Sequence, residues 1–283
     1  MQKDFPVRTS VPSVHPRRAA CSFAIALLLW PFPVRAHDPE DPRGFFPKAI
    51  LLGAEGRFDE AGEYIMKAPG GEEKDTLEIA RRLLSGIAEN RIDPQAAAMF
   101  FHGIAALRAG HTDEASREFA RAAAISPDYA DTYRLLGSLA AAAGNHTEAA
   151  GWLRTLVALS PSDGNAYQAL AASYHAMGQE RIAAGFYEKA IENGVQSAEI
   201  FIRLGDAYVA SGQAVEAQKR YQQALERDPG NGAAYLGIGL SYRLMGDAPG
   251  AGSSFARARK MCQARGEWET AAKAQGYLDE AVR

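Results

Sequence analysis

The sequence predicts an all-α chain built from repeated helical hairpins. Ala, Leu, Glu and Arg, which favour helices, are abundant, and no alternating run of β-branched residues indicates a strand. Small residues also recur with a period of 34 residues, without insertion or deletion. With 47% hydrophobic residues the chain can build a continuous core. Its net charge of -3 argues against a protein that binds nucleic acid through an overall positive charge.

The first 36 residues have the pattern of a secretory signal peptide. A basic stretch precedes an uncharged apolar run of twelve residues, Ala19–Trp30, which Pro31 ends. Val34 and Ala36 are the small residues that a signal peptidase requires. We therefore expect cleavage after Ala36 and export, to a bacterial periplasm. The alternative is a retained membrane anchor, for which the apolar run is short.

An irregular region separates this leader from the repeats. Residues 37–47 are expected to be extended. Residues 48–95 are expected to form an N-terminal cap, which begins with a degenerate hairpin carrying Gly56 and Ala61 at the spacing of the repeats. Residues 76–92 then have the apolar spacing of an amphipathic helix, which would complete the cap.

Five repeat units follow, each of two helices. They are residues 96–129, 130–163, 164–197, 198–231 and 232–265. In the fourth unit, Gly205 lies where the paired helices approach closely, and Gly212 ends the first helix in a conformation suited to positive φ. Ala217 lets the second helix lie against the first, and Tyr221 fills the groove between them. The other units have small and bulky residues at the same positions.

The ends of the units differ. Proline stops the second helix of three units, whereas unit three has Val195 and unit five has Gln263 at that position. We expect these two turns to be less sharply set, and the second helix of unit five to run on. Residues 266–283 have the spacing of a C-terminal capping helix with a polar outer face.

These landmarks resemble the tetratricopeptide repeat family over residues 96–265. The resemblance implies a right-handed superhelical solenoid whose first helices line a concave surface. It also implies that positions 2, 5, 9 and 12 of each unit face that surface. The candidate partner-binding residues at such positions are Arg134, Asn165, Gln168, His175, Glu199, Ile202 and Asp206. Relatives that grip a peptide carboxylate carry lysine and asparagine at positions 5 and 9, which this chain lacks.

In the first unit the same positions hold Phe100, Ile104 and Leu107. Two interpretations remain open for them. They could form an apolar end of the binding surface, or the N-terminal cap could bury them.

No motif for catalysis or cofactor binding stands out. The sequence has no GxSxG, HExxH or Walker motif and no Cys–His pair, and none of the six histidines has the spacing of a helical metal site. His102 is expected in the core, because leucine is usual at that position in the family. Cys262 is expected to be a buried small hydrophobe. We therefore predict a protein that is not an enzyme and holds no cofactor or metal.

The sequence thus predicts a protein-interaction scaffold in the cell envelope, which holds a protein or peptide segment during assembly, secretion or maturation of a complex. Peripheral association with an envelope complex and self-association remain open, and no nucleic-acid partner is expected. One alternative is a self-assembling or membrane-associated structural subunit. Another is an enzyme, or an accessory subunit of an enzyme, with a site in residues 37–95.

Overall fold

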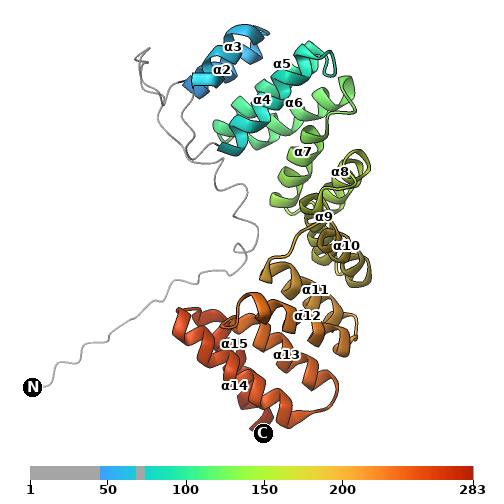
Figure 1. The fold of residues 1–283 in the computed structure, drawn as a ribbon, viewed down its shortest axis with the longest axis vertical. Helices are drawn as coiled ribbons and strands as arrows, with labels where there is room; N and C mark the ends of the chain where they lie inside the picture. The colour runs from blue at the N-terminus through green and yellow to red at the C-terminus, as the bar shows by residue number, and fades with distance from the viewer. Residues whose placement is uncertain (1–44, 68–73, 283) are drawn as a thin grey trace, which may run out of the picture.

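A computed structural model describes residues 45–67 and 74–282. The predicted signal peptide lies outside the described residues, as does most of the segment expected to be extended. Within the described ranges the chain forms fourteen helices and no strand, as expected for a helical solenoid. The helices stack along an arc from α2 at one end to α15 at the other (Figure 1). None of these helices is long and apolar enough to cross a membrane.

The helices follow one another as hairpins. The N-terminal region has α2 (Phe45–Ala54), α3 (Phe58–Lys67) and α4 (Lys74–Ala88). The five repeats are α5 (Pro94–Arg108) with α6 (Thr112–Ile125), α7 (Ala130–Ala142) with α8 (His146–Leu159), α9 (Gly164–Ala176) with α10 (Glu180–Glu192), α11 (Ala198–Ala210) with α12 (Ala214–Arg227), and α13 (Gly232–Leu244) with α14 (Ala248–Arg265). The last helix is α15 (Trp268–Val282).

Helix α2 begins at Phe45, so the end of the segment 37–47 is helical rather than extended. Pro47 does not prevent this, because proline is tolerated in the first turn of a helix. The apolar run that follows, Ala49–Leu52, then continues the helix.

A glycine turns the chain in every repeat, as expected. These glycines have φ between 72° and 81°, and they are Gly110, Gly144, Gly178, Gly212 and Gly246. Gly56 has φ 77° and makes the same turn between α2 and α3, so the N-terminal hairpin is built like the repeats. A side chain at this φ would be strained, which is why glycine recurs there.

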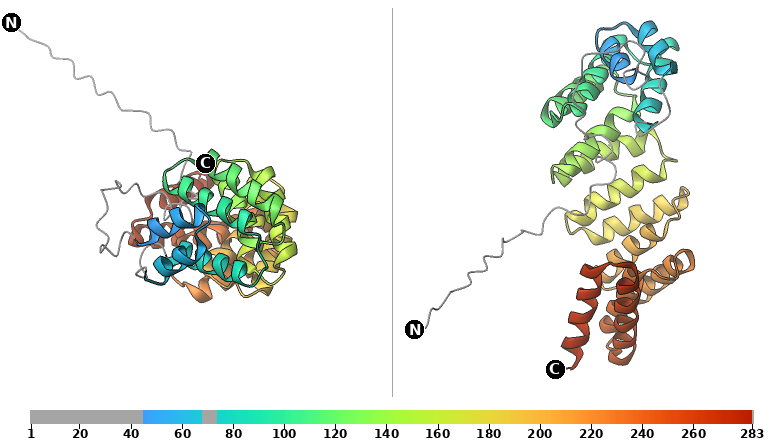
Figure 2. Two further views of the ribbon diagram at one scale, coloured as in Figure 1. Left: turned by 90° about the horizontal axis from the view of Figure 1, so that it is seen from above. Right: turned by 90° about the vertical axis from the view of Figure 1, so that its left-hand side faces the viewer.

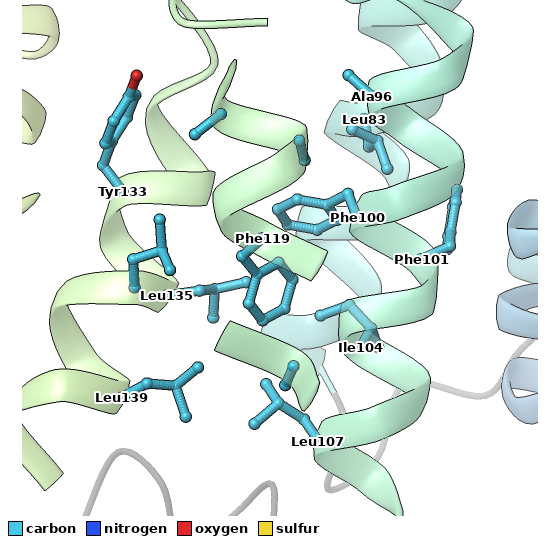
Figure 3. Packing of buried hydrophobic residues seen from close by; sticks show 14 of the residues in the cluster. Leu83, Ala96, Phe100, Phe101, Ile104, Leu107, Phe119, Tyr133, Leu135 and Leu139 are labelled. Carbon is cyan, nitrogen blue, oxygen red and sulfur yellow. The ribbon is translucent and has the colours of Figure 1, made fainter. Parts of the chain in front are cut away.

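The paired helices meet at the small residues of the first helices. A Cβ atom added at Gly103 would lie 2.6 Å from the Phe119 ring, and one at Gly205 would lie 2.6 Å from the Tyr221 ring. Both rings are fully buried. Figure 3 shows Phe119 packed opposite Phe100 in the layer between the helices, and their ring centroids are 5.1 Å apart. The close approach expected from the sequence is therefore present.

The end of unit three is better defined than its missing proline suggested. Gly194 takes φ 92° after α10, and the Val195 N–H donates to the Ala190 carbonyl at 3.0 Å, which caps the helix. The Val195 side chain also packs on Gly164, where an added Cβ would lie 2.7 Å from it. The expectation of a loosely set turn was wrong here. In unit five the second helix does run on, to Arg265.

The N-terminal hairpin stacks differently from the repeats. Between repeats, the second helix of one unit packs on the first helix of the next, whereas here the first helix, α2, packs on α5. Phe101 makes this contact: it points away from Phe119 (Figure 3), and its ring lies against Gly53. The neighbouring His102 is exposed, so the expectation of a core histidine was wrong.

Substituting alanine at two helical glycines should change the stability of the protein in opposite directions. Gly205→Ala should lower stability by about 1–3 kcal/mol, because the new methyl group meets the buried Tyr221 ring. Gly151→Ala, inside α8 with no atom within 4 Å of the new Cβ, should raise stability by up to about 1 kcal/mol. Urea unfolding of both variants measures this difference. Equal changes in the two variants would contradict the packing described here.

Candidate partner-binding groove

First helices of neighbouring repeats contact one another directly, α7 with α9 and α11 with α13, and in the middle of the arc α7 and α9 lie nearer its inner side than α8 and α10 (Figure 1; Figure 2 gives two further views). Each first helix from α7 onward begins at the first residue of its unit. In three of these helices the preceding residue is the N-cap. The side chains of Asp163, Ser197 and Asn231 each accept a hydrogen bond from a backbone N–H in the first turn of their helix. This regular start keeps equivalent residues aligned along the inner surface.

The N-terminal end of this surface is closed. Phe100, Ile104 and Leu107 are at most 3% exposed, which decides between the two interpretations of the first unit. Phe100 packs on Tyr129 as well as on Phe119, and Leu83 of α4 is fully buried beside it (Figure 3). The apolar residues of unit one therefore belong to the core.

Helix α4 is held on the inner side of the arc by an arginine. Arg82 donates two hydrogen bonds to the two carboxylate oxygens of Asp131, at 3.0 and 3.1 Å. Asp131 begins α7 and its side chain is only 8% exposed. The Tyr129 hydroxyl donates to the same carboxylate at 3.3 Å. A bidentate pair with a buried carboxylate fixes both position and orientation, so α4 covers the start of α7.

Arg134 continues this network. Its guanidinium contacts Asp131 at 3.3 Å and Asp163 at 2.7 Å, and its side chain is 34% exposed. Arg134 is therefore committed to two carboxylates of the chain itself, which removes it as a free partner contact. Arg82, Asp131, Arg134 and Asp163 form a continuous row of alternating charges along the inner surface.

The C-terminal end of the surface is covered as well. The guanidinium of Arg243, near the end of α13, lies 4.4 Å from the centre of the Tyr277 ring in α15. It also forms an ion pair with Glu280 at 3.4 Å. Helix α15 thus covers the C-terminal end of α13 at Arg243, and the open part of the surface lies between Arg134 and Arg243. We call this part, on α9, α11 and α13, the open face.

Small and amide side chains make up one side of the open face. Asn165 is exposed and Gln168 is half-buried, and neither has a hydrogen bond or ion pair with another described residue. Ala169, Ala172 and Ala176 are exposed beside them. An approaching backbone would find room here, with two amides able to donate and accept.

Charged groups in the middle of the open face are mostly paired. The His175 ring is 2.7 Å from the carboxylate of Glu180, and the exposed Glu199 pairs with Arg203 at 2.7 Å. Ile202 is 6% exposed and belongs to the core, so its place among the candidate contacts is wrong. Val209, Leu236 and Leu240 are large apolar residues that are half-buried on this face.

Asp206 stands apart from these pairs. It accepts a hydrogen bond from the hydroxyl of the buried Tyr221 at 2.8 Å, and no cation of the described chain forms a salt bridge with it. Burial raises its pKa above the ordinary value, although Tyr221, Arg203 and His175 act in the opposite direction. Because the folded state disfavours the charged form, an ionised Asp206 costs stability at neutral pH.

The described residues contain no group of three or more histidine, cysteine or acidic side chains that could hold a metal. Cys262 is buried, as expected, and burial raises the pKa of its thiol to about 11. At neutral pH this thiol is protonated and is a poor nucleophile.

Comparison with known proteins agrees with this geometry. Residues 100–164 and 202–265 match a family model described as a tetratricopeptide repeat. The chain is a tetratricopeptide-repeat protein. No curated protein matches it in sequence.

Solved structures share the tetratricopeptide-repeat fold. The crystal structure of YrrB, described as a repeat protein with an unusual peptide-binding site, is 18% identical, with a TM-score of 0.58 over 69% of this chain and 97% of that one. A crystal structure of MamA is 24% identical, with a TM-score of 0.55 over 58% and 96%. Part of a repeat protein from Cytophaga hutchinsonii is 15% identical, with a TM-score of 0.58 over 84% and 87%. These identities support the fold alone. The tetratricopeptide-repeat fold is typically a non-catalytic interaction scaffold.

Breaking the pair between Arg82 and Asp131 should loosen α4. Arg82→Gln should cost about 1–3 kcal/mol of stability, because a buried carboxylate loses a bidentate partner. It should also speed amide hydrogen exchange in α4. Arg91→Gln is the control, since it breaks only an exposed pair with Glu89, which is worth about 0–1 kcal/mol. If the backbone amides of α4 exchange at the same rate in both variants, the contact with Asp131 does not hold this helix.

Proposed function

We propose that the protein is an exported scaffold that binds a segment of another protein on its open face, during assembly, secretion or maturation of a cell-envelope complex. The observation that carries the proposal is the open face itself. Helix α4 covers one end of the inner surface and α15 covers the other, and within the described residues the part between them carries exposed and half-buried side chains.

The chemistry of this face suits a polypeptide. Free amides at Asn165 and Gln168 can pair with a backbone or a polar side chain, and the exposed alanines allow close approach. The half-buried apolar residues on α11 and α13 add area that a partner would remove from water. Recognition by side-chain pockets and grooves is a common mode of peptide binding.

The cellular location in this proposal rests on the first 36 residues, with their basic stretch, apolar run and small residues before a cleavage site. Sequencing the N-terminus of the protein purified from its own cells tests this part. A mature chain that begins at His37 is the expected result, and a chain that keeps its leader in the cytoplasm would contradict it.

Filling the open face should block partner capture. Ala172→Trp places a large ring on the exposed inner side of α9, and it should reduce recovery of the partner by about tenfold or more in co-purification from the cell envelope. Ala256→Trp is the matched control, because it makes the same exchange at an exposed site on the outer helix α14.

Both variants should keep the melting temperature of the unaltered protein within a few degrees, since neither site is buried. If the two variants recover the same partners in equal amounts, the open face is not the binding surface.

A further inference from the structure

We propose that the open face takes an amphipathic helix of the partner, which places an arginine or lysine side chain on Asp206. This inference rests on the proposed function, because it names the kind of segment that the face holds.

The chain itself shows how its inner surface accepts a helix. Helix α4 lies on the inner side of the first two repeats, and consecutive residues of it make two kinds of contact. Leu83 is fully buried in the apolar layer, and Arg82 binds the carboxylate of Asp131. An apolar anchor beside an arginine is thus the combination that already fits this surface.

The open face offers the same two features to a second helix. Val209, Leu236 and Leu240 are half-buried on it and can receive apolar side chains. Asp206 lies about one turn before Val209 on α11, as a carboxylate with no salt bridge to another described residue. Where α4 lies on the inner surface, the carboxylate of Asp131 has an arginine partner, Arg82.

The charge around Asp206 favours a cation. The carboxylates of Glu199 and Asp206 share the guanidinium of Arg203, which is already paired with Glu199, and the nearby His175 ring is itself in contact with Glu180. A partner's cation would balance this excess of negative charge. It would also offset the cost of keeping Asp206 half-buried, because an opposite charge favours the ionised carboxylate. An acidic or phosphorylated segment would meet repulsion instead.

The dimensions fit a short helix. The inner surface already accepts a helix of about 22 Å, the length of α4 at about 1.5 Å per residue. Helix α4 has 15 residues.

A selection from a display library of random 16-residue peptides, with the whole chain as bait, tests the inference. Binders that Ala172→Trp blocks are counted as bound to the open face. Among these we expect helical, amphipathic sequences that share an arginine or lysine. Asp206→Asn should weaken their binding by about tenfold or more. The control Asp113→Asn, at an exposed site on the outer helix α6, should leave binding unchanged.

The results separate the inference from the function on which it rests. Suppose that Ala172→Trp blocks the binders but Asp206→Asn does not weaken them, or that the binders have extended or acidic sequences. Either result would overturn the proposal of a helix with a cation and would leave the open face as a binding surface. A selection without any binder that depends on Ala172 would count against both. The amide oxygen that Asp206→Asn introduces can still accept the Tyr221 hydrogen bond, so an unchanged melting temperature shows that lost binding is not lost folding.

Discussion

The close approach of two helices at a small residue is the constraint on which this structure depends. In four of the five repeats a bulky side chain of the second helix lies over a glycine of the first helix, as Tyr221 does over Gly205. This contact fixes the angle and the distance between the two helices of a hairpin, and the glycine with positive φ fixes the turn that joins them. Because the same contact returns every 34 residues, the first helices align on one side. The inner surface is a consequence of that alignment.

This surface is not equally accessible along its length. Arg82 ties α4 over the first repeats, and Arg243 ties α15 over the last. Terminal units of a solenoid must cover apolar faces that have no neighbour, and these helices do so from the inside as well as from the ends. The chain thereby confines binding to its middle repeats, where Asp206 is held half-buried at a cost in stability. Such costs are common at functional positions.

Much of the fold could be predicted from the sequence, because the decisive signals are local. Gly212 and its counterparts mark the turns, and Gly205 and Tyr221 mark the packing within a hairpin. Asn193-Gly194 is also a local signal, for a helix end, and it could have shown that Val195 does not loosen the turn. The pair between Arg82 and Asp131 joins residues 49 positions apart, and no local pattern predicts it. For the same reason Arg134 seemed free in the sequence, although two carboxylates bind it in the structure.

We propose that a partner is held on the inner side of the middle repeats. Site-specific photo-crosslinking in living cells tests it most directly, with the crosslinking residue placed at Ala172 on α9 or at Ala256 on α14. We expect a discrete crosslinked product from position 172 and none from position 256. Equal products from both positions, or a product from position 256 alone, would contradict it.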